Sequence, residues 1–126
     1  MIRRKINPGQ VLLTPGRGIP PTRQRPFFVT NITSNYIDIQ IGEAQTFNRL
    51  PMQMFDAVED FFRNNSTGRL RIAAEHTMTS TPGSVDEIVR SAVDFPRVIG
   101  NYVASILEAA GCVRYAMAGN RKYIQI

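Results

Sequence analysis

Residues 95–126 read Phe95-Pro-Arg-Val-Ile-Gly-Asn-Tyr-Val-Ala-Ser-Ile-Leu-Glu-Ala-Ala-Gly-Cys-Val-Arg-Tyr-Ala-Met-Ala-Gly-Asn-Arg-Lys-Tyr-Ile-Gln-Ile126. Apolar residues recur at helical spacing, which predicts an amphipathic helix that starts after Asp94. Gly111 fits the left-handed position that often ends a helix. Residues 113–126 then predict a hairpin with two cations at its turn. The buried helix face should comprise Val98, Ile99, Tyr102, Val103, Ile106, Leu107 and Ala110.

The residues upstream of this stretch predict two more helices and a strand. Pro51 suits the first turn of a helix that ends in the Asn- and Gly-rich run 64–68. Residues 69–75 alternate between polar and apolar, which predicts a strand. Ser84 and Glu87 have the spacing of a capping box, which opens a short helix. From Pro51 onward the predicted order is therefore helix, strand, helix, helix, strand, strand.

The first fifty residues predict a small antiparallel sheet. Candidate strands lie at 9–14, 27–32, 36–41 and 46–48. Residues 15–26 hold four prolines and two glycines, which exclude a helix or a central strand. We therefore expect an α+β protein, with a β-rich extension over 1–50 and a three-helix unit with a C-terminal hairpin over 51–126. The length suggests a single compact domain over 1–126.

The positive charge of the chain is concentrated near its N-terminus. The formal net charge is +5. Residues 1–49 hold seven basic and two acidic groups, whereas residues 50–126 hold eight of each. Arginines at Arg17, Arg23 and Arg25 suit contacts with phosphate. The loop that contains these arginines, residues 15–26, could instead be a proline-rich ligand for another protein or a subunit arm. A basic loop also keeps a small protein soluble.

The predicted order of elements over residues 51–126 resembles the winged helix-turn-helix superfamily. The run Ile106-Leu-Glu-Ala-Ala-Gly-Cys-Val-Arg114 is similar to that family's exit from its third helix, where the helix stops at glycine and the wing begins. The resemblance implies that the third helix lies in the DNA major groove. Arg97, Asn101 and Ser105 would then read bases. Arg121 and Lys122, in the wing, would grip the DNA backbone.

The expected solvent face of the third helix contains small residues as well as polar ones. Gly100 and Ala104 would let the helix backbone approach a DNA groove closely. They would equally let another element of protein pack against the helix. The whole face expected to be open comprises Arg97, Gly100, Asn101, Ala104, Ser105 and Glu108.

The sequence offers little chemistry for catalysis, and we expect no enzyme. The one histidine, His76, has no evident partner in sequence, and one Cys with one His does not make a zinc site. Cys112 follows a helix C-terminus, where the helix dipole opposes a thiolate. We expect no metal and no cofactor. A single cysteine, no signal peptide and no stretch of about 20 apolar residues point to a cytoplasmic protein without membrane association.

These observations lead to two hypotheses of function. The first is a small non-catalytic protein that binds double-stranded DNA, as a regulator or as the DNA-targeting accessory of a mobile-element or restriction system. The second is a protein-interaction or oligomer-forming accessory subunit that uses the winged helix as a scaffold, and a homodimer is one such form. A third reading, a ligand pocket, would draw on Phe27, Phe28, Phe47, Phe55 and Phe61, although these aromatics fit a core equally well.

Overall fold

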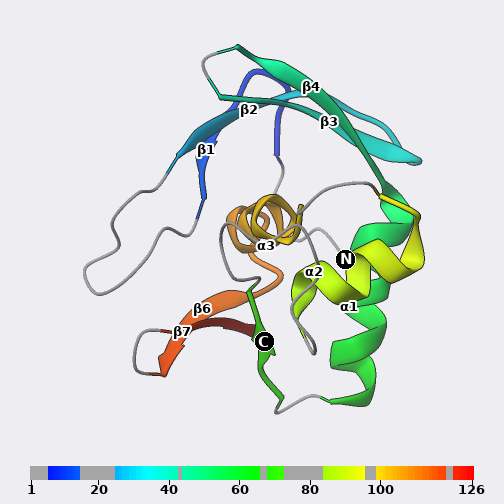
Figure 1. Ribbon diagram of the computed structural model, residues 1–126, viewed down its shortest axis with the longest axis vertical. Helices are drawn as coiled ribbons and strands as arrows, with labels where there is room; N and C mark the ends of the chain where they lie inside the picture. The colour runs from blue at the N-terminus through cyan, green and yellow to red at the C-terminus, as the bar shows by residue number, and fades with distance from the viewer. Residues whose placement is uncertain are drawn as a thin grey trace.

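A computed structural model of the chain describes residues 6–14, 25–42, 44–65, 68–72, 84–95, 99–118 and 121–126. The elements in chain order are β1 (Val11–Leu13), β2 (Pro26–Ile32), β3 (Tyr36–Ile41), β4 (Thr46–Pro51), α1 (Met52–Asn64), β5 (Leu70–Arg71), α2 (Val85–Ala92), α3 (Gly100–Ala109), β6 (Arg114–Ala118) and β7 (Arg121–Gln125). Helix α3 lies between two sheets, with the four-strand sheet on one side and β6 and β7 on the other (Figure 1). The predicted α+β class is confirmed.

The N-terminal sheet is antiparallel, with strand order β1-β2-β3-β4. The predicted hairpin of β2 and β3 is present, and its register pairs Val29 with Ile39 and Ile32 with Ile37. Because side chains alternate along a strand, one face of the sheet carries the apolar residues that enter the core. This inner face includes Phe27, Val29, Ile37, Ile39 and Leu50, all fully buried.

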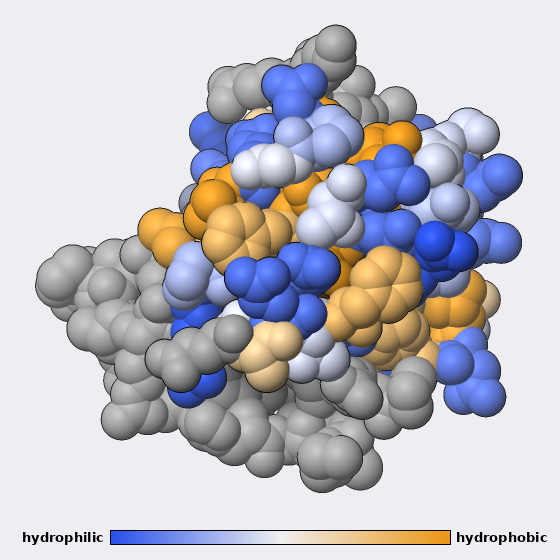
Figure 2. All heavy atoms as spheres, turned by 90° about the horizontal axis from the view of Figure 1, so that it is seen from above, coloured by the Kyte–Doolittle hydropathy of each residue, from blue (hydrophilic) through white to orange (hydrophobic). Residues whose placement is uncertain are grey.

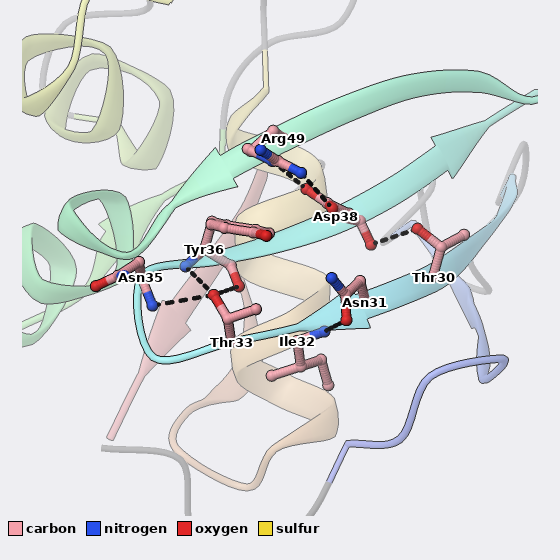
Figure 3. A network of polar contacts seen from close by, with 8 residues as sticks. All are labelled: Thr30, Asn31, Ile32, Thr33, Asn35, Tyr36, Asp38 and Arg49. Carbon is pink, nitrogen blue, oxygen red and sulfur yellow. Dashed lines mark hydrogen bonds and ion pairs between the residues drawn. The ribbon is translucent and has the colours of Figure 1, made fainter.

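An ion pair on the other face of this sheet joins β3 to β4. Arg49 donates from Nε to Asp38 Oδ1 at 2.8 Å and from Nη2 to Asp38 Oδ2 at 3.0 Å. The guanidinium carbon lies 3.8 Å from the centre of the Tyr36 ring. The hydrogen bond to Asp38 raises the pKa of Arg49, which favours the charged guanidinium. Figure 3 shows this pair beside the turn in which Thr33 Oγ1 accepts from the backbone of Tyr36.

Helix α1 follows β4 without a loop. Pro51 ends the strand and precedes the first helical residue, Met52, at a φ of −57°. The strand is therefore longer than the predicted 46–48, and the helix begins one residue later than predicted. The apolar stripe is buried as predicted, and it includes Met54, Phe55, Val58 and Phe62.

Helix α2 begins with the predicted cap. The Ser84 hydroxyl accepts a hydrogen bond from the Glu87 amide at 3.1 Å. Val85 and Val89 point into the core and are fully buried. The carboxylate of Asp86 is also buried, although the sequence suggested no role for it.

The start of α3 differs from the prediction. Asp94 was expected to open the helix, but the first helical residue is Gly100. Instead, Asp86 of α2 supplies the cap: its Oδ1 accepts from the amides of Ile99 at 2.7 Å and Gly100 at 2.9 Å. An N-cap carboxylate satisfies backbone amides that have no partner inside the helix. The residues between Phe95 and Ile99 lie outside the described part of the chain.

The C-terminal sheet has the strand order β5-β7-β6 and is antiparallel. Gly111 has the positive φ, 77°, that was expected at the end of α3. The predicted hairpin is present as β6 and β7, and β5 pairs with β7 through Leu70 and Ile124. Both residues of that pair are buried. Of the strand predicted over 69–75, residues 73–75 lie outside the described residues.

Candidate nucleic-acid interface

The helix face that was expected to read a DNA groove is largely covered by protein. Gly100 and Ala104 are buried, and Ser105 is only 3% exposed, so the expectation that they face solvent was wrong. A Cβ at Gly100 would lie 2.6 Å from the amide nitrogen of Asp86. The small residue therefore serves close packing between α3 and α2, which was the alternative interpretation of Gly100.

Ser105 connects α3 to both sheets. Its hydroxyl donates to the main-chain carbonyl of Leu13, in β1, at 2.6 Å. The Ser105 side chain also lies near Tyr115, in β6. Burial raises the pKa of Tyr115 to about 12, the Ser105 side chain opposes this rise, and the nearby Glu108 carboxylate adds to it. A hydroxyl used in this way is not open to a base edge.

The other residues of the face that was expected to be open are not gathered on an exposed surface either. Asn101 is half-buried, and its Oδ1 is buried without a hydrogen-bond partner among the described residues. Glu108 is half-buried near Tyr115. Arg97 lies outside the described part of the chain.

The arginine-rich loop is described only at its end. Arg17 and Arg23 lie outside the described residues, whereas Arg25 is exposed just before β2. The Arg25 amide donates to Thr14 Oγ1 at 2.9 Å, which ties this end of the loop to the end of β1. Arg25 precedes β2 of the four-strand sheet, whereas Arg121 begins β7 of the C-terminal sheet. Helix α3 lies between these two sheets (Figure 1).

The two predicted wing cations point to opposite faces of β7. Arg121 pairs with Ala118 and is exposed, whereas Lys122 pairs with Met117 and is half-buried. Successive side chains of a strand alternate between faces, so Arg121 and Lys122 cannot both belong to one surface of the sheet. Lys122 lies on the side of Ile124, which faces the core.

The face to which Arg121 belongs gathers more arginines than the sequence suggested. The register places Arg71 beside Tyr123 on that face, and Arg114 beside Gln125. Arg69 donates from Nε to the Gln125 side chain at 3.0 Å and so lies on the same side. We call this surface the arginine face. It comprises Arg69, Arg71, Arg114, Ala116, Ala118, Arg121, Tyr123 and Gln125.

The arginine face contains no carboxylate side chain to balance its charge. Residues 68–72 and 113–126 include neither Asp nor Glu. Among the described residues, ion pairs neutralise three other arginines, Arg49, Arg63 and Arg90. No ion pair within the described residues reaches the four arginines of the arginine face, and Arg69, Arg114 and Arg121 are exposed. Their positive charge is therefore available to an anionic partner.

Four residues of this surface were missed as candidates from the sequence: Arg69, Arg71, Arg114 and Tyr123. Two signals could have found them. Arg69 and Arg71 stand two apart, as do Arg121 and Tyr123, and this spacing places each pair on one face of a strand. The lack of Asp and Glu across both segments is the second signal. Which strands are neighbours was not readable from sequence.

No family model, curated protein or solved structure matches this chain. Among the described residues, no three His, Cys, Asp or Glu side chains come together in a group that could hold a metal ion. No helix in the described ranges has the length and apolar character needed to cross a membrane. His76 lies outside the described residues, and Cys112 is half-buried. Of the five phenylalanines weighed as a pocket lining, Phe27 and Phe55 are core residues and Phe47 is exposed.

Proposed function

We propose that this protein binds nucleic acid without catalysing a reaction, and that the arginine face makes the contact. The observation that carries the proposal is the convergence of four arginines on one surface that holds no Asp or Glu: one in each of β5, β6 and β7, and one just before β5. Arginine presents a planar fork of donors that matches phosphate oxygens, and it stays charged at any physiological pH. A phosphate backbone is the partner that such a surface fits best.

In this proposal residues 51–126 are still related to the winged helix, but nucleic acid contacts the arginine face and not the third helix. The order of elements from α1 to β7 supports that relationship over residues 51–126. The buried Gly100 and Ser105 argue against groove reading by α3 in this arrangement. Arg121 remains a proposed contact, and Lys122 lies on the opposite side of the same strand. Arg25 is exposed and would contribute only if the ligand extends past α3.

The test is a binding measurement as a function of salt. We expect the wild-type protein to bind labelled DNA, in fluorescence anisotropy, with an affinity that falls steeply as salt rises. Combined substitution of Arg71→Ala, Arg114→Ala and Arg121→Ala should weaken binding at least about tenfold. The slope of log K against log salt should become shallower by about 2, because each phosphate contact contributes about 0.7–0.9.

The matched control is Arg63→Ala. Arg63 is also an exposed arginine, but it lies on α1 and pairs with Glu59 and Asp60. Its loss should leave both affinity and salt slope unchanged. If the control and the triple variant lost DNA affinity equally, the loss would be an effect of net charge and not of the arginine face. A triple variant with unchanged affinity would refute the proposed interface.

A second candidate function, a protein-interaction or oligomer-forming subunit, is favoured by one observation on the opposite side of the molecule. Val11, Leu13 and Phe47 are 51%, 50% and 56% exposed. The register through β2 and β3 places all three on the outer face of the four-strand sheet. Figure 2, which looks down on the molecule from that side, shows apolar side chains there among polar ones.

Analytical ultracentrifugation over a wide range of protein concentration tests the homo-oligomer form of this second candidate. Self-association through the outer face should weaken when Leu13→Thr and Phe47→Thr are combined, since threonine keeps a strand-forming side chain but removes apolar area. A protein that is monomeric at every concentration would exclude the homodimer. The arginine face lies on the other sheet, so these substitutions should not change the affinity for DNA.

A further inference from the structure

We propose that the arginine face binds single-stranded nucleic acid, and that Tyr123 stacks against an unpaired base. This inference rests on the proposed function and names its substrate class. Proteins that bind single strands combine a positively charged surface with aromatic side chains on which bases stack. The arginine face has both features, because Tyr123 lies in its central strand, β7.

The neighbours of Tyr123 leave room for a base. On β5 its partner is Arg71, and on β6 its partner is Ala116, whose side chain is a single methyl group. Arg121 lies two residues away on the same face, about 7 Å along the strand. A base on the Tyr123 ring would therefore have a guanidinium on one side, and phosphates on both sides of that base would lie within reach of arginines.

Tyr123 is also the one tyrosine whose side chain has no ring contact or polar partner within the described residues. The chain has four tyrosines, and all four lie in the described ranges. The Arg49 guanidinium lies over the Tyr36 ring, Tyr102 packs edge-on against Phe27 with ring centres 5.1 Å apart, and Tyr115 lies near Ser105. Within the described residues, the Tyr123 ring has no aromatic or cationic partner and its hydroxyl no hydrogen bond, although the side chain is partly exposed.

The shape of the surface favours a single strand over a duplex. Reading a duplex requires an element that enters a groove, such as a helix or a two-stranded ribbon. Around Tyr123 the arginine face is the broad side of a three-strand sheet, because β5 pairs with β7 at Arg71 and Tyr123, and α3 lies behind that sheet (Figure 1). Unpaired bases can instead splay outward onto an aromatic ring, and duplex bases cannot do this without unstacking.

The experiment compares labelled oligonucleotides of about 15 nucleotides, a length that covers known single-strand site sizes. The probes are oligo(dT), oligo(rU), an abasic strand of equal length and a mixed-sequence duplex. The wild-type protein should bind oligo(dT) about tenfold or more tightly than the abasic strand, because the abasic strand keeps the phosphates and lacks the bases. Binding of the duplex as tightly as oligo(dT) would overturn the inference.

Two substitutions at one position isolate the ring. Tyr123→Val should weaken binding to oligo(dT) about 5- to 100-fold and leave the salt slope and the abasic affinity unchanged. Tyr123→Phe keeps the ring and should bind within about twofold of the wild type, which also controls for the loss of the hydroxyl. Circular dichroism of each variant checks that the sheet persists. Equal affinities of Tyr123→Val and the wild type for oligo(dT) would refute stacking.

Comparing the triple arginine variant with Tyr123→Val distinguishes nucleic-acid binding by the arginine face from stacking on Tyr123. If the triple arginine variant weakens binding but Tyr123→Val does not, the interface stands and stacking fails. If the triple variant binds oligo(dT) as well as the wild type, the proposed function itself fails. Stacking and phosphate contacts do not read the 2′-hydroxyl, so oligo(dT) and oligo(rU) should bind with similar affinity. A preference for one of them would identify DNA or RNA as the source of the strand.

Discussion

The hydroxyl of Ser105 donates a 2.6 Å hydrogen bond to the main-chain carbonyl of Leu13, which lies 92 residues earlier in the chain. The bond joins the central helix to an edge strand of the N-terminal sheet. It places Ser105 at a contact between α3 and β1 and not at a ligand surface.

Ser105→Ala should therefore change stability and not binding. We expect the free energy of unfolding to fall by about 1–2 kcal/mol, because the Leu13 carbonyl loses its hydrogen-bond donor on α3. Urea denaturation followed by circular dichroism measures this change. Ser91→Ala is the control, since Ser91 is exposed on α2 and should alter stability by less than about 0.5 kcal/mol. A tenfold loss of DNA affinity in folded Ser105→Ala would contradict the relocated interface.

Gly100→Ala should destabilise the contact between α2 and α3. The added Cβ would lie 2.6 Å from the Asp86 amide nitrogen and 2.7 Å from its Cα. These are backbone atoms, so the two helices would have to move apart, at a cost of about 1–3 kcal/mol. The better helix propensity of alanine offsets up to about 1 kcal/mol of this.

Gly42→Ala provides a comparison with a different mechanism. Gly42 has a φ of +73° and nothing within 4 Å of its added Cβ. Its cost, about 1 kcal/mol, should come from backbone conformation alone. Thermal unfolding of both variants measures the difference, and a Gly100→Ala protein as stable as the wild type would show that the helices are not in close contact.

Asp86→Ala should be among the most destabilising single changes. The buried carboxylate caps the Ile99 and Gly100 amides and also accepts from Arg90 Nη1 at 3.3 Å. Its removal leaves two buried amides and a mostly buried guanidinium without that partner, at a cost of about 3–5 kcal/mol. Asp86→Asn keeps one acceptor oxygen and should cost less. Asp94→Ala is the control: a large effect there would restore the helix start that the sequence suggested.

The partly buried Tyr115 should make the protein less stable at alkaline pH. Its pKa is raised, mainly by burial, to about 12, whereas an unfolded tyrosine titrates near 10. Between these values the folded state holds a proton that the unfolded state has lost, so stability falls as pH rises from about 10 to 12. The full effect is roughly 3 kcal/mol, since one pKa unit corresponds to about 1.4 kcal/mol.

Urea denaturation at several alkaline pH values measures the slope, and Tyr115→Phe should make it shallower. Burial also raises the pKa of Tyr102, so a smaller slope in the same direction should remain in that variant. An unchanged slope in Tyr115→Phe would show that the Tyr115 hydroxyl titrates as if exposed.

Local patterns were good predictors of individual elements. The alternation in β3, the apolar stripe of α1, the Ser84 cap and the positive φ of Gly111 all follow from residues close together in sequence. The start of α3 did not follow from such a pattern. Its cap, Asp86, lies thirteen residues before Ile99 and belongs to another helix.

In the candidate interface, too, features set by neighbouring residues were predicted and features set by distant residues were missed. Arg121 was recognised because two adjacent cations at a hairpin turn are visible in the sequence. Arg71 and Arg114 were not recognised, because they are separated by more than forty residues and meet on one face only when β5 and β6 both pair with β7. Ser105 was assigned to solvent because its own helix pattern is polar there, and the sheet that covers it comes from the other end of the chain.

The sequence by itself determined the elements, their order and the α+β class, because hydrophobic periodicity, caps and turn residues act over a few neighbouring positions. The tertiary structure alone decided which faces are open. Burial depends on what packs against a residue, and for Ser105 of α3 that partner is β1, whose Leu13 lies 92 residues earlier. The same packing covered the helix that was expected to read DNA and left three of the four arginines of the arginine face, Arg69, Arg114 and Arg121, exposed.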